Sequence, residues 1–166
     1  MTYLRLAVMM FLQYFVWGAW FVALGAYIGA HEGENALFQP GLVGLMYGTA
    51  AIGGMIAPFF VGMIADRFFA TQFMLAFLHL VGAGVLYGLS TVDSHWMFYS
   101  VMILYFLCYM PTLALTNSLS FHHLKNPEKQ FPAVRVLGTI GWIAAGLCLG
   151  LAQYLGWEAI EAESVA

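Results

Sequence analysis

Five long apolar runs dominate this chain of 166 residues and restrict what it can fold into. A helix needs about 20 residues, with a rise of about 1.5 Å each, to cross ~30 Å of hydrocarbon, and every run is about that long or longer. Only 8% of the residues are charged and 63% are hydrophobic, unlike a soluble domain. We therefore predict an all-α polytopic membrane protein. The transmembrane bundle of residues 1–156 has predicted helices at about 4–30, 41–64, 73–91, 96–119 and 133–156.

Basic residues of the loops all fall on one side of the predicted helices. Arg5 stands at the start of the first helix, Arg67 follows the second, and Lys125 and Lys129 follow the fourth, whereas the alternate connections contain no Lys or Arg. The positive-inside rule then predicts a cytoplasmic N-terminus in a cell (inner) membrane. The net charge of −3 comes largely from acidic residues of the outer loops, so it does not indicate a nucleic-acid partner.

Residues 157–166 form an acidic stretch that five spans would place outside the cytoplasm. This extracytoplasmic tail has no helix stop signal. We expect it to mark a truncation point, with the chain being the N-terminal part of a longer protein.

Reactive and metal-binding residues are sparse. Cys108 and Cys148 both lie in apolar runs, where cysteine usually behaves as a small hydrophobic residue. No spacing of His and Cys matches a zinc site, and no Gly-rich phosphate loop follows a strand pattern. We therefore predict no metal, no cofactor and no disulfide.

Small residues and prolines within the spans predict how the helices pack and bend. Glycines four residues apart let neighbouring backbones approach closely, and proline interrupts helical hydrogen bonding. The pairs are Gly25/Gly29, Gly44/Gly48, Gly84/Gly88 and Gly146/Gly150, and the prolines are Pro58 and Pro111.

The fifth span carries a pattern of polar and aromatic residues that is costly in hydrocarbon. Pro132 is placed for a first helical turn, and Arg135, Thr139 and Trp142 follow at spacings of four and three, on one helix face. A guanidinium, a hydroxyl and an indole suit a flat ligand rich in acceptors. Alternatively, Arg135 reaches lipid headgroups from near the helix start and Trp142 contacts lipid. The residues alone leave both interpretations open.

Other spans add further polar candidates. Gln13 and Trp17 pair an amide with a ring deep in the first span, and Asn117 stands in the fourth. Thr112 and Thr116 can satisfy their hydroxyls on their own helix, which favours a structural role, whereas Asn117 is harder to satisfy in this way.

Two sites with ionisable side chains also stand out. His79 is alone deep in the third span, where it is a candidate proton carrier, although a neutral imidazole bonded to a neighbouring helix is favoured. Asp66 and Arg67 lie at the end of the second span, where a charged pair suits either a cytoplasmic gate or a solvated turn.

Around this pair the sequence begins to resemble a known superfamily. Residues 62–67 (GMIADR) resemble the loop signature of the major facilitator superfamily, although residues 68–72 lack its second glycine and trailing basic residues. Three further segments resemble the nucleoside:proton symporter family in the same order and spacing. They are residues 11–20 (FLQYFVWGAW), 109–118 (YMPTLALTNS) and 131–141 (FPAVRVLGTIG).

The resemblance implies a nucleoside site and a role for particular residues. In that family an arginine, a threonine and an aromatic residue of helix five line the nucleoside site, and they match Arg135, Thr139 and Trp142. Phe would be more usual at the last position, so the larger indole bears on base preference. Gln13 and Trp17 are further candidates for this site.

The resemblance also implies twelve helices in two halves, of which this chain would hold the first five, with the C-terminal half missing. Its partners would be a nucleoside, protons, the lipid bilayer and that missing half. We thus predict a proton-coupled nucleoside importer working by alternating access, with Asn117 in the site and Asp66 and Arg67 in the gate. Coupling acids would lie in the missing half, with His79 the weaker candidate here.

Other functions remain as alternatives. A major facilitator transporter of another small polar solute, such as a sugar, would share the fold and the loop signature. An intramembrane enzyme would need a nucleophile–base or metal constellation that His79 and Asp66, on different helices, do not supply. A purely structural subunit would not explain the face of Arg135.

Overall fold

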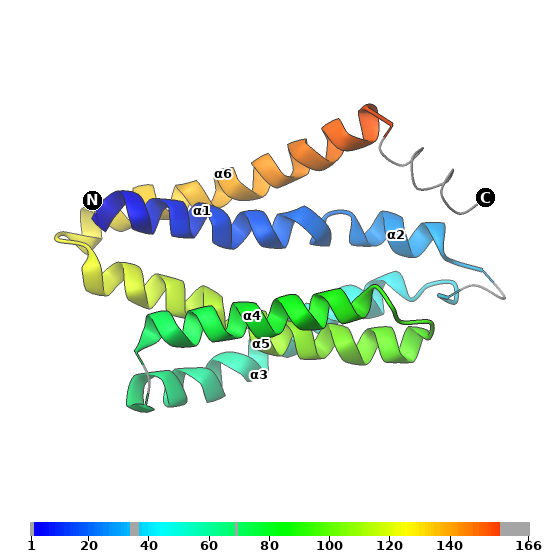
Figure 1. Ribbon diagram of the computed structural model, residues 1–166, viewed down its shortest axis with the longest axis horizontal. Helices are drawn as coiled ribbons and strands as arrows, with labels where there is room; N and C mark the ends of the chain where they lie inside the picture. The colour runs from blue at the N-terminus through cyan, green and yellow to red at the C-terminus, as the bar shows by residue number, and fades with distance from the viewer. Residues whose placement is uncertain (1, 34–36, 69, 157–166) are drawn as a thin grey trace. The chain divides into compact units, whose positions relative to one another are not determined.

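The fold consists of helices joined by short connections. A computed structural model describes residues 2–33, 37–68 and 70–156, with side chains for all of these except residues 58–68. The helices, shown in Figure 1, are α1 (Thr2–Phe21), α2 (Leu24–Ala30), α3 (Val43–Phe68), α4 (Thr71–Leu89), α5 (His95–His123) and α6 (Pro127–Tyr154).

Most of these helices can cross a membrane. Among the described residues, four helical segments are long and apolar enough to do so. A shorter apolar segment, Val43–Ala57, opens α3, whose helical backbone continues to Phe68. The chain is therefore an all-α polytopic membrane protein, as its apolar runs predict. The four segments are Thr2–Ala30, Thr71–Leu89, His95–His123 and Pro127–Tyr154.

The helices differ from the prediction most clearly at the first and last spans. The first span, expected to be continuous over 4–30, is interrupted by a turn at residues 22–23, where the amide of Ala23 donates to the carbonyl of Trp20. The last helix begins at Pro127, six residues before the predicted start at 133. Pro127 holds the first position, and the side chain of Asn126 caps the helix by accepting from the Lys129 amide.

The described chain divides into two compact units. The first contains Met1–Ala26 and Leu124–Ala166, with α1 packed along α6; the second is Tyr27–His123, with α3, α4 and α5. In the first unit the two helices run in the same direction (Figure 1). Their starting ends meet in one apolar cluster. Its buried residues are Leu6, Met10, Leu124 and Val134.

Glycines bring α1 and α6 into close contact. A methyl group added at Gly141 would overlap the carbonyl oxygen of Phe11, and one at Gly18 would lie 3.1 Å from the Cβ of Ala145. The α1–α6 contact is therefore built partly from backbone. Such contacts are typical of helix packing in membranes.

Most of the predicted Gly-x-x-x-Gly pairs do not make such contacts. An added methyl group meets no other atom within 4 Å, among the parts of the chain that the structure describes, at any glycine of three pairs. The predicted packing role of these pairs is therefore not seen among the described residues of their own units. The three are Gly44/Gly48, Gly84/Gly88 and Gly146/Gly150.

In the second unit α5 is the central helix. It packs against both α3 and α4, and α4 runs antiparallel to it (Figure 1). A methyl group added at Gly53 of α3 would lie 2.5 Å from the Cβ of Phe106, which marks the closest α3–α5 approach. Leu78 of α4 packs with Cys108 and Leu115 of α5.

Candidate functional site

Arg135 lies on the third turn of α6, over an aromatic ring of α1. Its guanidinium carbon is 4.3 Å from the centre of the Tyr14 ring, the geometry of a cation–π contact. Because α6 begins at Pro127, Arg135 lies eight residues into the helix, roughly 12 Å along its axis. Arg135 is thus further from the helix start than the sequence predicted, and its contact with lipid headgroups stays an alternative. Arg135 is also half-buried, with one side of its guanidinium covered by Tyr14.

Two turns further along α6, Trp142 is held in an aromatic cluster. Its indole meets that of Trp17 edge to face, with ring centres 5.0 Å apart and planes at 85°. Phe21 lies 6.2 Å from Trp142 and 5.5 Å from Trp17, so the three rings contact one another. Edge-to-face packing of this kind fixes the orientation of each ring. The pairing of Trp17 with Trp142 is not evident from sequence spacing.

Thr139 is exposed between these two groups on α6. The helix face that contacts α1 carries Gly138, Gly141 and Ala145, all buried and spaced three and four residues apart. Arg135, Thr139 and Trp142 follow the same spacing on the adjacent face. The three residues thus share one face of α6, and two of them, Arg135 and Trp142, contact aromatic rings of α1.

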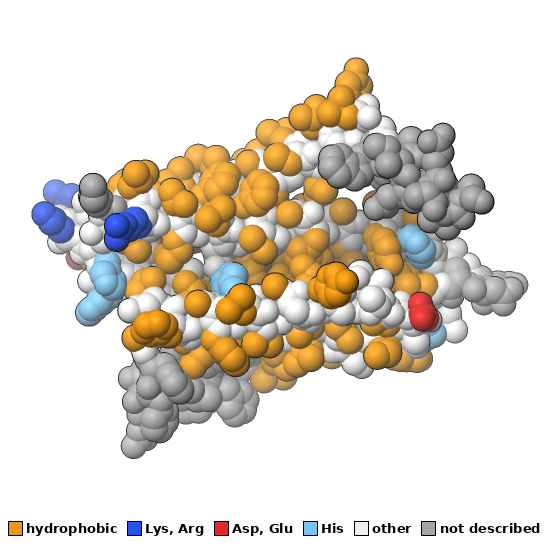
Figure 2. Space-filling view, viewed as in Figure 1, with side chains coloured by type: hydrophobic (Ala, Val, Ile, Leu, Met, Phe, Trp, Pro, Cys, Tyr) orange, Lys and Arg blue, Asp and Glu red, His pale blue; other side chains and the backbone are white. Residues whose placement is uncertain are grey.

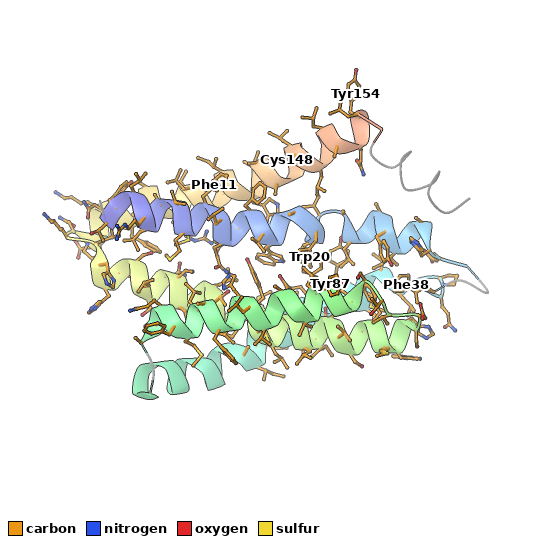
Figure 3. The ribbon with its side chains drawn as sticks, in the orientation of Figure 1. Phe11, Trp20, Phe38, Tyr87, Cys148 and Tyr154 are labelled. Atoms are coloured by element: carbon orange, nitrogen blue, oxygen red, sulfur yellow. The ribbon has the colours of Figure 1, made fainter. Side chains whose placement is uncertain are left out.

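Gln13 is buried on α1, with 3% of its surface exposed, one turn before Trp17. In Figure 3 the labelled Phe11 lies on the α6 side of α1 and Trp20 on the opposite side. Helical spacing places Gln13 away from the side that carries Phe11. The structure thus puts Gln13 and Arg135 in one unit without placing them against each other.

Asn117 belongs to α5, in the second unit, so the structure does not relate it to Arg135. Its neighbours Thr112 and Thr116 bond to carbonyl oxygens of Tyr109 and Thr112 on the same helix, as their structural interpretation predicts. The Oδ1 of Asn117 is buried and has no hydrogen-bond partner among the described residues. A buried amide oxygen without a partner is costly, which makes Asn117 a candidate for a ligand contact.

His79 is half-buried on α4. Its Nδ1 lies 2.9 Å from the carbonyl oxygen of Leu75 one turn earlier, so the nitrogen that donates is Nδ1. The ring stands 6.1 Å from that of Tyr109 on α5. The favoured interpretation, a hydrogen bond to a neighbouring helix, differs from what is seen, since the bond is to its own helix and the neighbour supplies a ring.

The side chains of Asp66 and Arg67 lie outside the described residues. The backbone of α3 is helical to Phe68, so both residues fall in its last turn. Their predicted role in gating stays a prediction.

Basic side chains of the first unit gather at one end. Figure 2 shows Lys and Arg side chains where α1 begins, and hydrophobic side chains along the helices. Arg5, Lys125 and Lys129 are exposed there, next to the cluster that joins the starts of α1 and α6. Arg135 is set apart from them by its depth in the helix.

Tyr14 is the residue of this site that the sequence did not single out. It sits between the candidates Gln13 and Trp17, and its polar tip and ring resemble the interface anchors common in membrane proteins. A usable signal was the small-residue face Gly138, Gly141 and Ala145. That face marks where α6 admits a close neighbour, and Tyr14 occupies the space at Gly138.

Known proteins that resemble this chain are transporters. Putative nucleoside transporter YegT of Escherichia coli is 41% identical over 165 residues, which cover 99% of this chain and 38% of YegT. Xanthosine permease of Escherichia coli is 40% identical over 86% of this chain and 34% of its own length. The chain thus spans little more than a third of the relatives it matches.

Solved structures give the same result. A crystal structure of the nucleoside transporter NupG superposes with a TM-score of 0.82 at 29% identity, covering 91% of this chain and 37% of that one. A mutant of NupG superposes with a TM-score of 0.84 over 93% of this chain. The sequence also matches the family described as Nucleoside H+ symporter over residues 1–166. With its motifs, its helical fold and these matches in agreement, the chain belongs to the nucleoside H+ symporter family.

Proposed function

We propose that the full-length protein is a proton-coupled nucleoside importer of the cell inner membrane, with its N-terminus in the cytoplasm. The observation that carries this proposal is the guanidinium of Arg135, held over the Tyr14 ring on the helix face that also presents Trp142. A charged side chain inside a membrane costs free energy. Such residues in transmembrane segments therefore mark candidate functional sites. Family membership names the class of ligand for which such a face is suited.

The chemistry of this face fits a nucleoside. Arg135 has five N–H donors for base carbonyls or sugar hydroxyls, and the exposed hydroxyl of Thr139 adds a donor and an acceptor. Trp142, with its plane fixed by Trp17 and Phe21, offers a surface on which a base stacks. Gln13 and Asn117 are further candidates for polar contacts with the substrate.

Transport itself would follow from alternating access. In this scheme a second half of the transporter faces the unit that carries Arg135, and rocking of the halves exposes the site to each side in turn. Asp66 and Arg67 would help to close the cytoplasmic side. Proton coupling would come from acidic residues of the second half, with His79, whose Nδ1–H donates to its own helix, as the weaker candidate.

Uptake measurements test the proposal directly. Cells expressing the full-length gene would be given labelled uridine, adenosine or a labelled hexose, with and without a protonophore. We expect nucleoside uptake that collapses with the proton gradient and no hexose uptake. Hexose uptake alone would support another major facilitator substrate, and uptake insensitive to the protonophore would refute proton coupling.

The orientation has a separate test. Asp93→Cys and Lys129→Cys place single thiols at exposed positions on opposite sides of the proposed topology, after Cys108 and Cys148 are changed to Ala. An impermeant maleimide added to intact cells should label the first and spare the second. Labelling of the Lys129→Cys variant alone would reverse the proposed orientation.

A further inference from the structure

The ring of Tyr14 is held in place by the residues packed around it. It packs on the apolar cluster formed by Leu6, Met10, Leu124 and Val134, and it fills the space left by the missing side chain of Gly138. A methyl group added at Gly138 would lie 2.6 Å from Cδ2 of the ring. Glycine at this position therefore lets the ring approach the backbone of α6 directly.

The same glycine serves Arg135. The methyl group added at Gly138 would also lie 3.1 Å from Nη1 of Arg135, so the ring and the guanidinium share one space beside the helix. The guanidinium carbon lies 4.3 Å from the ring centre, so the face of Tyr14 packs against the cation. An arginine side chain has about 2 kcal/mol of rotamer entropy to lose on becoming fixed. Because the Tyr14 ring is already fixed by packing, less of this entropy cost has to be offset by the free energy of ligand binding.

We propose that Tyr14 is a positioning residue, whose ring face holds the Arg135 guanidinium in the orientation that receives the substrate. This inference rests on the proposed function of Arg135 as a nucleoside contact. It assigns the role to the aromatic face and not to the hydroxyl. It also makes Gly138 the position that admits the ring.

Uptake kinetics of the full-length protein separate the ring from the hydroxyl. Tyr14→Leu removes the ring face and should raise KM for uridine about 3- to 30-fold, with Vmax within about twofold. Tyr14→Phe keeps the face and should keep the native KM. Phe15→Leu is the matched control, because it removes a neighbouring half-buried ring of α1 that stacks on Phe11 and should leave KM unchanged.

Gly138→Ala is an independent test that leaves both partners in place. Its methyl group displaces the ring, so KM should rise as it does for Tyr14→Leu, with a normal amount of protein in the membrane. Equal KM values for wild type and Tyr14→Leu would overturn the proposal. So would an equal loss in Tyr14→Phe and Tyr14→Leu, because the hydroxyl would then be the group that matters.

A stability measurement tests the pair without any substrate. The apparent Tm of the purified protein is measured for Tyr14→Leu, Arg135→Leu and the double variant. If the ring holds the guanidinium, the double variant loses less than the sum of the single losses. Additive losses would overturn the positioning role, whereas absence of nucleoside uptake by the wild type would refute the proposed function alone.

Discussion

The buried hydroxyls of the second unit and the guanidinium of the first unit are satisfied in different ways. In the second unit the hydroxyls of Thr49, Thr112, Thr116 and Ser120 are buried and bond to carbonyl oxygens of their own helices. In the first unit Arg135 lies against the ring of Tyr14, which belongs to another helix. The comparison shows that polarity within a span is a poor guide by itself. What matters is whether the helix carrying the group can satisfy it.

The two units also differ in what their closely packed glycines contact. In the first, Gly141 meets the backbone of Phe11, which leaves the neighbouring face of α6 unobstructed. In the second, Gly53 meets the side chain and backbone of Phe106, within a unit whose central helix is covered on both sides. Each unit nevertheless carries a candidate for the site, Arg135 in the first and Asn117 in the second.

The largest effect is expected from Arg135→Ala in the full-length protein. If the first unit presents the site, nucleoside uptake should fall at least about 100-fold, because removing a fixed guanidinium leaves its polar partners on the substrate unpaired. Membrane abundance, measured by immunoblot, should match the wild type. Uptake within threefold of the native rate would contradict the binding role. Arg135 would then be no more important for uptake than the hydroxyls of the second unit.

Gly141→Ala should have the next largest effect, and it acts on folding. Its methyl group would overlap the carbonyl oxygen of Phe11, so α1 and α6 must separate, at a cost of about 1–3 kcal/mol in the free energy of unfolding. Thermal unfolding in detergent measures this loss. Gly146→Ala is the matched control on the same helix, since its methyl group meets nothing within 4 Å and should not lower the Tm. Equal Tm values for the two variants would show that the close contact is unimportant.

The smallest effects come from the second unit and separate two neighbouring residues. Asn117→Ala should raise KM about 10-fold, equivalent to about 1.4 kcal/mol, because the oxygen without a partner is the one available to a ligand. Thr116→Val should change KM by less than about twofold, because its hydroxyl serves only its own helix. Uptake kinetics of both variants, normalised to membrane abundance, measure the difference. A greater loss in Thr116→Val than in Asn117→Ala would reverse the assignment.

The helices were predictable because hydrocarbon leaves few alternatives. A run of about 20 apolar residues has to satisfy its own backbone, so its length and composition suffice to identify a helix. The ends were less predictable. Residues 126–128 were predicted to lie before the last helix. In the structure Asn126 is the cap of α6, Pro127 is its first position and Glu128 is the acidic residue of its first turn. No proline at residues 22–23 indicates the turn that the structure has there.

The site was predictable along a helix and not between helices. Spacing alone places Arg135, Thr139 and Trp142 on one face, because a helix has a fixed period. The pairing of Tyr14 with Arg135 and of Trp17 with Trp142 depends on how α1 packs on α6. The small residues of α6 at that contact are Gly138, Gly141 and Ala145, with spacings of three and four residues.

The contact between Gly141 and the backbone of Phe11 has a mechanical consequence. Contacts between side chains can slide by changing rotamers, but a contact between two backbones has no such freedom. We expect α1 and α6 to tilt as one rigid body when the transporter changes from facing one side of the membrane to facing the other. The guanidinium and the indole would then keep their spacing throughout the cycle.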